Sequence, residues 1–269
     1  MTTLTHIDTA CVLLEVAGLR LLTDPVFDPP GRRYWFGWGS SSRKTGTPAL
    51  SPAEVGTVDA VLLSHHQHGD NLDTAGRAFA TAAPIVLTTP AGRRRFPGNA
   101  MAVTPAVHVA LPVVDAATTR AARPSPRLIV TGSPARHRPA WIPSFVAGPA
   151  TGFILESDDL PRGPLMITGD TVLFGPLREA AARVRPDILV IHVGAVRFPY
   201  LSGPARFTMN AAEAAELAGI SGARLVVAIH TSGWTHFREG PEALGAAFER
   251  AGLPDRLRIP VPGVPISLD

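Results

Sequence analysis

Three histidines and one aspartate occur within six residues, in the segment SHHQHGDNLD at positions 64–73. They are His65, His66, His68 and Asp70. Imidazole nitrogens and carboxylate oxygens are ligands that zinc and other divalent metals take from proteins. The segment directly follows the apolar run VDAVLL at 58–63, and a turn after a buried strand can direct alternate side chains to one point. Because a chance cluster of this kind is rare, the segment predicts a metal site.

Three further polar residues share one position relative to the predicted strands, at or just beyond a C-terminal end. They are His137 after LIVTGSPAR, Asp170 after LMITG and His230 after LVVAI. Layered α/β folds place their functional sites at such strand ends, so we expect these residues to join the first cluster. Cys11 is the only cysteine, which excludes a disulfide framework and a thiolate metal cluster within one chain.

The hydrophobic pattern predicts strands that alternate with helices. Strands are expected over residues 11–16, 19–22, 58–63, 101–113, 127–131, 151–156, 164–168, 187–193 and 224–229. Helices are expected over 72–81, 176–185, from Asn210 through Leu217, and 241–251, with a further strand-helix unit over 84–95. Residues 28–52 are rich in Gly, Pro, Ser and aromatic side chains, and predict a surface loop that packs over another part of the protein.

The composition is that of a globular protein. The 269 residues are 45% hydrophobic and 17% charged, which predicts one domain over 1–269. No apolar run reaches the roughly 20 residues of a membrane span, and the N-terminus lacks the pattern of a secretory leader, so we expect a cytoplasmic protein. Of the 25 basic residues only Lys44 is lysine. The densest basic run, Arg93 to Arg95, has no aromatic or motif context, which predicts a solvated loop and no nucleic-acid contact.

Several stretches together resemble the metallo-β-lactamase superfamily, and within it the branch of ascorbate-6-phosphate lactonases and N-acyl-phosphatidylethanolamine phospholipase D. They are GLRLLTDPVF at 18–27, LLSH and DNLD within 62–73, TGSPARH at 131–137, GPATGFIL at 148–155, ITGD at 167–170 and VVAIH at 226–230. These stretches span nearly the whole chain in the expected order. The resemblance implies an α/β fold, the four-layer αββα metallo-β-lactamase sandwich of two similar halves.

The first metal motif of that family is HxHxDH. Counting back from Asp70, His66 and His68 fill the first two ligand positions, but Asn71 stands where the last histidine belongs. One extra residue lies between the strand serine and this motif, so His65 competes with His66 for the first position. Both histidines remain candidates.

The resemblance implies a metal site with one or two zinc ions. The implied ligands of the first ion are His66 or His65, His68 and His137. The implied ligands of the second ion are Asp70 and His230, with Asp170 bridging the two ions. An asparagine oxygen is a neutral, harder ligand than imidazole, so we expect the second site to bind less tightly or to prefer Mn²⁺ or Fe²⁺.

The resemblance also implies catalytic roles. A divalent ion lowers the pKa of bound water from 15.7 to about 7, and Asp70 would orient the resulting hydroxide. His192 in VIHVG and His236 in HTSGWTH resemble pocket positions, so either is a candidate proton donor or substrate contact. The alternative for both is a structural role. Asp24 resembles a buried carboxylate that orients a metal-binding histidine.

We therefore expect a metal-dependent hydrolase of a small-molecule substrate with an ester-like bond: a lactone, a phosphodiester or an acyl ester. The alternative is a non-hydrolytic binding or regulatory protein with an altered metal site, which Asn71 favours and the retained ligands disfavour. Aromatic side chains are candidates to wall an apolar pocket: Trp35, Phe36, Trp38, Trp141, Phe145, Trp234 and Phe237. The sequence does not predict the oligomeric state.

Overall fold

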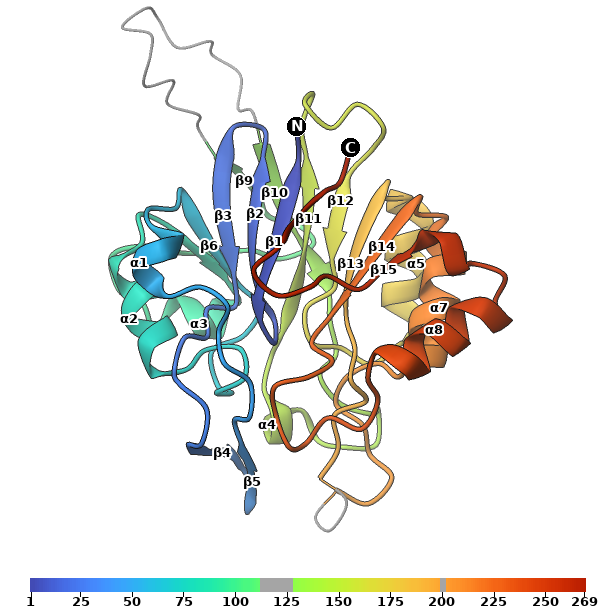
Figure 1. Cartoon of the computed structure of the whole chain (residues 1–269). Coiled ribbons are helices and arrows are strands. Elements are labelled where there is room, and N and C mark those ends of the chain that lie inside the picture. Colours follow the sequence, from blue (N-terminus) through green and yellow to red (C-terminus); the bar gives the residue numbers. More distant parts are fainter. Residues whose placement is uncertain (112–127, 199–201) are drawn as a thin grey trace, which may run out of the picture.

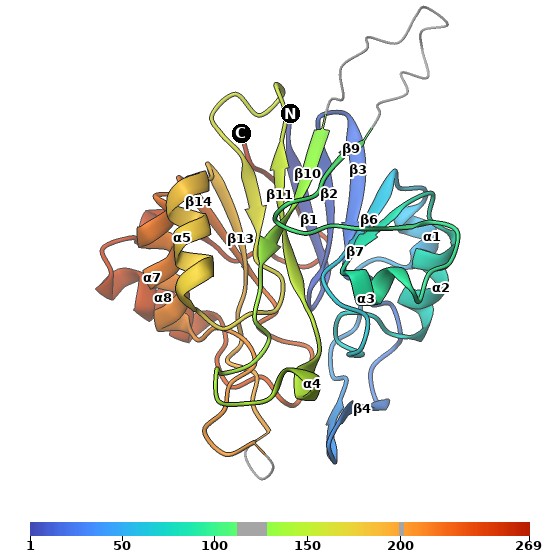
Figure 2. The ribbon, with the colours of Figure 1, turned by 180° about the vertical axis from the view of Figure 1, so that it is seen from behind.

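Two seven-stranded sheets pack against each other, and helices cover the outer face of each (Figures 1 and 2). The computed structural model describes residues 1–111, 128–198 and 202–269. The layers follow the order helix, sheet, sheet, helix. This is the αββα sandwich that the sequence predicts.

The first sheet has the strand order β16-β1-β2-β3-β6-β7-β8. Its strands are β1 Thr3–Asp8, β2 Cys11–Val16, β3 Leu19–Thr23, β6 Ala60–Leu63, β7 Val86–Thr88, β8 Ala100–Ala102 and β16 Pro265–Ser267. The helices outside it are α1 Pro52–Val55, α2 Thr74–Ala82 and α3 Pro90–Arg93. From β3 to β8 the neighbouring strands are parallel. Parallel strands are covered on both faces, which explains why the β6 segment reads as a continuous apolar run.

The second sheet has the order β15-β14-β13-β12-β11-β10-β9. Its strands are β9 His108–Leu111, β10 Leu128–Pro134, β11 Thr151–Glu156, β12 Leu165–Ile167, β13 Ile188–His192, β14 Leu225–Ile229 and β15 Leu257–Arg258. Its helices are α5 Gly175–Val184, α7 Ala211–Ser221 and α8 Pro241–Arg250, followed by the short 3₁₀ helix η1 Pro254–Arg256. A one-turn helix, α4 Ser144–Ala147, lies apart at the lower end in Figure 1.

The main core lies between the two sheets. Leu14 and Leu62 of the first sheet belong to the same buried cluster as Phe153 and Val190 of the second. Two further clusters join the outer face of each sheet to its helices. Since the central strands are buried on both faces, an unpaired polar side chain along their length would be costly. The polar residues with candidate functions therefore lie at the strand ends.

Residues 28–52, predicted as an irregular loop, contain a two-stranded hairpin. Its strands are β4 Arg33–Gly37 and β5 Ser40–Arg43, which pair antiparallel. We call residues 33–43 the β4–β5 arm; it extends past the lower edge of the first sheet in Figure 1. The turn between the strands has left-handed backbone at Gly37, Trp38 and Gly39, with φ of 86°, 52° and 77°. Such a turn favours glycine at two of these positions, and the sequence supplies it.

Four predicted helices and most predicted strands are confirmed, but the single strand over 101–113 is wrong. The chain turns at Thr104–Val107, so that β8 belongs to the first sheet and β9 to the second. Residues 112, 113 and 127 of the predicted strands lie outside the described residues. Strands β1, β15 and β16 were not predicted, since each is either polar or only two or three residues long.

Within the described part of the chain, no helix combines the length and the apolar character that crossing a membrane requires.

Candidate metal centre

The candidate ligands converge because several strands end at one edge of the sandwich. Strands β12, β13 and β14 are parallel to one another, and β10 runs in the same direction, since β11 is antiparallel to both β10 and β12. Their C-terminal ends therefore lie at the same edge, which carries His137, Asp170 and His230. The segment 64–73 follows β6 of the facing sheet. Each group of ligands draws on both sheets.

The first group consists of three buried histidines. Nε2 of His65 lies 3.0 Å from Nδ1 of His68, and Nε2 of His137 lies 3.1 Å from the same Nδ1. The ring of His137 is held by its own Nδ1, which donates to the carbonyl of Phe207 at 2.8 Å. This contact leaves Nε2 of His137 with a free lone pair. Burial and the neighbouring imidazoles lower the pKa of His65 well below its usual value and that of His68 to about 3, so both rings are neutral, as metal ligation requires.

His65, rather than His66, joins this group. Candidate ligand atoms of His65, His68 and His137 all lie within 4.8 Å of one another, whereas His66 is half-buried and lies outside the group. Burial and the nearby guanidinium groups of Arg95 and Arg77 lower the pKa of His66. Counting back from Asp70 therefore selects His66, which lies outside this group, and His65 occupies the place beside His68 and His137.

The second group consists of Asp70, Asp170 and His230, all buried. Nε2 of His230 lies 3.5 Å from Oδ2 of Asp70 and 3.5 Å from Oδ2 of Asp170. Nε2 of His137 lies 3.9 Å from Oδ2 of Asp170, so this carboxylate faces both groups, as a bridging ligand must. Burial alone would lower the pKa of His230, but the two carboxylates outweigh it and raise that pKa to about 9. Burial opposes ionisation of Asp70, but contacts with His230 and His236 hold its pKa well below the usual value.

These polar atoms are arranged as a cation site would require. Oδ1 of Asp170 and Nε2 of His230 are buried and have no hydrogen-bond partner among the described residues. Buried polar atoms without partners are costly, and a divalent cation would satisfy both. His230 also has left-handed backbone, with φ of 61°, which is uncommon outside glycine and often marks a functional position.

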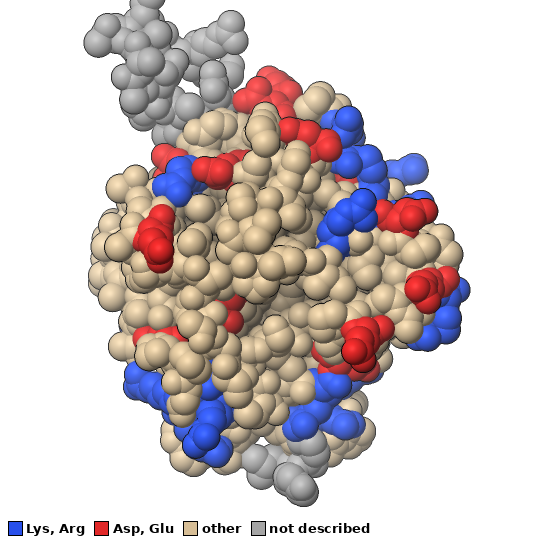
Figure 3. Space-filling model, viewed as in Figure 1, with Lys and Arg blue, Asp and Glu red and all other residues tan. Residues whose placement is uncertain are grey.

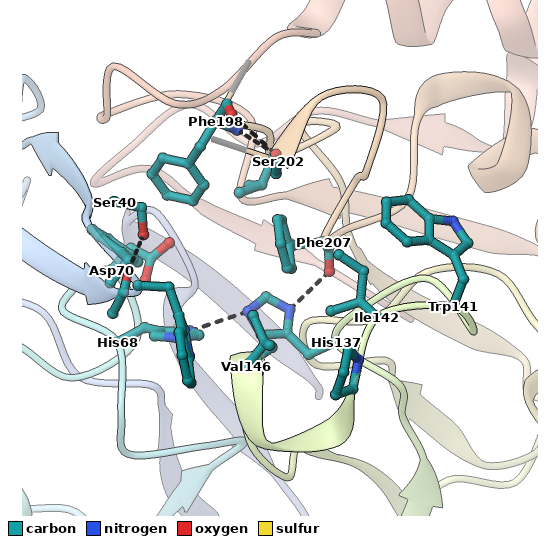
Figure 4. A pocket seen from close by; sticks show the side chains of 16 residues that line it. Ser40, His68, Asp70, His137, Trp141, Ile142, Val146, Phe198, Ser202 and Phe207 are labelled. Carbon is teal, nitrogen blue, oxygen red and sulfur yellow. Dashed lines mark hydrogen bonds between the residues drawn. The ribbon is translucent and has the colours of Figure 1, made fainter. Parts of the chain in front are cut away.

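A cavity of about 280 Å³ opens onto the two groups (Figure 4). His68, Asp70 and His137 lie at its base. Its walls come from the β4–β5 arm, from the segment around α4 and from the chain between β13 and α7. The wall residues are Phe36, Gly37, Trp38, Ser40, Trp141, Ile142, Pro143, Val146, Ala147, Val196, Phe198, Ser202 and Phe207.

The chain was compared with known proteins. Residues 19–231 match the sequence model of a protein family that is described as a β-lactamase superfamily domain. The chain belongs to the β-lactamase superfamily. A protein of Methanoculleus marisnigri named a metal-dependent hydrolase is 31% identical over 124 residues, which cover 45% of this chain and 49% of that relative. The match thus spans about half the length of the curated relative.

Solved structures share the fold of this chain. An isothiocyanate hydrolase from Delia radicum gut bacteria superposes with a TM-score of 0.79 at 21% identity, covering 99% of this chain and 98% of its own. A possible metal-dependent hydrolase from Veillonella parvula gives a TM-score of 0.79 at 17% identity and covers 100% of both chains. The resemblance to the metallo-β-lactamase fold is thereby confirmed.

Asn71, which replaces the last histidine of the superfamily motif, lies beside the second group. Its side chain is buried, and with the amide nitrogen turned toward the carboxylates it donates to Oδ1 of Asp70 and to Oδ2 of Asp170, both at 3.2 Å. In this orientation the amide holds two ligands in place by hydrogen bonds and contributes no imidazole. Asn71 therefore lies beside Asp70 and Asp170, and the second group contains one histidine, His230.

His192 and His236, predicted as candidate catalytic residues, are both buried and do not line the cavity. Nε2 of His236 lies 3.1 Å from Oδ2 of Asp70, and its ring packs at 5.0 Å from that of Phe36. His192 lies behind the second group, with Nε2 3.6 Å from Oδ2 of Asp24. Burial lowers the pKa of His192 to about 3. The structure thus places His236 against the cavity residues Asp70 and Phe36, and His192 against Asp24.

Asp24 supports the segment that carries the histidines. Its Oδ1 accepts a hydrogen bond from the backbone N–H of Ser64 at 2.7 Å, directly before His65. Burial raises the pKa of Asp24 to about 7. The resemblance implied that Asp24 orients a metal-binding histidine. The structure places the Asp24 carboxylate against the backbone of Ser64, the residue before the candidate ligand His65.

The predicted aromatic residues divide into two sets. Phe36, Trp38 and Trp141 line the cavity, whereas Trp35 and Phe145 are exposed outside it and Trp234 and Phe237 pack against the ring of His236. Sequence reasoning missed the aliphatic wall of α4 and the wall residues from Val196 to Phe207. The α4 segment follows β10 and the segment from Val196 follows β13, and both strands end at the candidate metal site. This position after the strand ends was the sequence signal that could have predicted these walls.

The only lysine of the chain anchors the arm that forms one wall. Lys44 directly follows β5, and its ammonium lies 2.9 Å from Oδ2 of Asp8 and 3.3 Å from Oδ2 of Asp73. The Lys44 side chain is fully buried. Asp73 is also the N-cap of α2, where it accepts from the N–H of Gly76 at 2.8 Å. One ammonium therefore joins the arm, β1 and the helix that follows the metal segment.

Proposed function

We propose that the chain is a metal-dependent hydrolase that cleaves a small ester-like bond, in a lactone, a phosphodiester or an acyl ester. One observation carries this proposal. Two groups of buried candidate metal ligands lie side by side, and the carboxylate of Asp170 faces both of them. Three members of these groups also line a cavity: His68, Asp70 and His137. Each group offers three candidate ligand atoms without the missing histidine of the motif.

The donor atoms fit divalent metals of two kinds. Three imidazoles, from His65, His68 and His137, are a common zinc set with an open fourth position. Two carboxylates and one imidazole, from Asp70, Asp170 and His230, form a harder set that suits zinc, manganese or ferrous iron. We therefore assign zinc to the first group, and zinc, Mn²⁺ or Fe²⁺ to the second.

When bound, a divalent ion supplies Lewis acidity, which lowers the pKa of water from 15.7 to about 7 and polarises a carbonyl or phosphoryl group. Asp70 is the ionised carboxylate at the base of the cavity, and it accepts the proton of the attacking water and returns it to the leaving group. His236 holds the Asp70 carboxylate in place from outside the cavity. The apolar walls limit access of bulk water to the reacting bond.

A second candidate reaction is the hydrolysis of isothiocyanates, in which R–N=C=S and water give R–NH₂ and carbonyl sulfide. The structure from Delia radicum gut bacteria carries that name and covers the whole fold. The observation that favours this reaction here is the apolar wall of the cavity, which suits an aryl or alkyl group R.

The test is turnover together with metal content. The purified protein, loaded with Zn²⁺ or Mn²⁺, is assayed against lactones, phosphodiesters, acyl esters and isothiocyanates, and its metal is counted by elemental analysis. We expect Asp70→Asn to retain metal in the histidine group and to lose on the order of a hundredfold or more in rate. Asp158→Asn, an exposed aspartate after β11, is the matched control.

Failure to bind either metal, together with no turnover of any substrate, would support a non-hydrolytic binding protein instead. If the Asp70→Asn variant, with its metal content measured, cleaves a substrate at the wild-type rate, Asp70 has no role in the mechanism.

A further inference from the structure

The cavity above the metal groups has mainly apolar walls, apart from the hydroxyl groups of Ser40 and Ser202. The β4–β5 arm supplies Phe36 and Trp38 on one side, and the segment 141–147 supplies Trp141, Ile142 and Val146 on the other. The two sides approach each other where the exposed rings of Trp38 and Phe145 lie 5.3 Å apart. Phe198 and Phe207 complete the wall (Figure 4). A ligand in this cavity is surrounded mainly by aromatic and aliphatic carbon.

The charged groups lie either at the base of the cavity or outside it. Among the described residues that line it, Asp70 is the only acidic side chain, and no lysine or arginine is present. Basic side chains do occur at this end of the molecule (Figure 3), where Arg33 and Arg43 are exposed on the arm. Arg138 follows His137 directly, but its guanidinium donates to the backbone carbonyls of Pro139 and Ile142.

An ionic group away from the metals would therefore lose its hydration without gaining a partner. The transfer of an unpaired charge into apolar surroundings is costly, whereas an apolar group gains free energy in proportion to the area it buries. The cavity volume of about 280 Å³ lies just below the ~300–1,000 Å³ typical of small-molecule sites. The walls thus select a small, uncharged and apolar group.

We propose that the part of the substrate that is not attacked is an uncharged aryl or short alkyl group, held between Trp38 and the segment 141–147 while the reacting bond lies at Asp70. This inference rests on the proposed hydrolysis and specifies its substrate class. Trp38 is assigned as a specificity-determining residue, because it lines the cavity from an exposed turn and faces the opposite wall. A sugar phosphate, whose non-reacting part is polar or charged, is excluded by the same reasoning.

Binding of inert probes tests this assignment without turnover. The metal-loaded protein is titrated by calorimetry with benzyl alcohol, 2-phenylethanol and 3-phenylpropanol. It is also titrated with two charged analogues of 3-phenylpropanol, in which a sulfonate or a trimethylammonium group replaces the hydroxyl group. We expect the dissociation constant to fall about fourfold for each added methylene, with a negative heat-capacity change. We expect both charged analogues to bind at least tenfold more weakly than the alcohol.

Two tryptophans on the same arm provide a matched pair of variants. Trp38 and Trp35 are 65% and 70% exposed, so neither substitution by alanine should unfold the protein, but only Trp38 lines the cavity. Trp38→Ala should weaken 3-phenylpropanol binding about three- to tenfold, and Trp35→Ala should leave it unchanged. Equal effects of the two substitutions, no binding of any alcohol, or tighter binding of a charged analogue would each overturn the assignment.

The outcomes also separate this inference from the proposed hydrolysis. If the alcohols bind as expected while no ester, lactone or isothiocyanate is cleaved, the cavity assignment holds and the hydrolytic function fails. If substrates are cleaved without preference for an apolar group, and Trp38→Ala changes neither KM nor probe binding, the hydrolytic function holds and the substrate class is wrong.

Discussion

Replacing Lys44 by methionine should destabilise the whole protein, although the residue lies outside the metal groups. The substitution keeps the apolar stem but removes the ammonium between Asp8 and Asp73, which are 5% and 0% exposed. Removing one partner of a buried ion pair leaves uncompensated charge and typically costs about 3–5 kcal/mol. Asp73 retains hydrogen bonds from the backbone N–H groups of Asp28 and Gly76, so we expect about 3 kcal/mol, the lower end.

The measurement is the free energy of unfolding from urea titration monitored by circular dichroism. Arg43→Met is the matched control, because Arg43 is the preceding residue and is exposed, so its loss should cost less than about 0.5 kcal/mol. The double variant Lys44→Met with Asp8→Asn should recover part of the loss, since it removes one of the stranded charges. A loss below 1 kcal/mol for Lys44→Met would refute the reasoning that this ammonium anchors the arm.

Three other predictions concern the metal segment and its support. His65→Ala should weaken binding of the first metal ion by more than tenfold in a chelator competition, whereas His66→Ala should leave it unchanged; the reverse order would restore the register counted back from the aspartate. Asn71→His should tighten the second ion by about tenfold in the same assay, and unchanged affinity would argue that position 71 does not face that ion. Burial opposes ionisation of Asp28, but hydrogen bonds from the Tyr34 hydroxyl and two helix amides outweigh it and lower its pKa. A carboxylate whose folded-state pKa is lowered contributes stability above pH ~4, and this contribution is lost as the pH falls through the folded-state pKa. Asp28→Asn should therefore cost about 1 kcal/mol at pH 7, and the cost should shrink as the pH falls. A cost that does not change with pH would contradict this.

The fold was predictable because the ligand-bearing segments lie in a recognisable order and each follows an apolar run. The sequence left both His65 and His66 as candidates, since which of them lies beside His68 and His137 depends on how the inserted residue bends the chain. The hairpin of the β4–β5 arm escaped prediction because its strands carry serine, arginine and exposed aromatics, and it is held by Lys44 through contacts distant in sequence. Local pattern carries no information on such contacts.

The cavity was predictable only in part. The aromatic content of residues 34–38 indicated that this segment packs over another part of the protein, and Phe36 and Trp38 do line the cavity. Phe207 could not be assigned from the sequence, because its carbonyl positions His137 across a separation of seventy residues. Backbone acceptors have no residue-type signature, so only the three-dimensional structure identifies them.

The division of each ligand group between the two sheets makes a bound ion a cross-link between the halves of the molecule. His65 and His68 follow a strand of the first sheet and His137 a strand of the second, while Asp70 faces Asp170 and His230 across the same boundary. Neither half alone offers a full set of ligands. An ion that binds only the assembled sandwich stabilises it by mass action, by about 4 kcal/mol at a thousandfold excess over its dissociation constant. Metal supply would then govern how long the two halves stay together as well as how fast the site works.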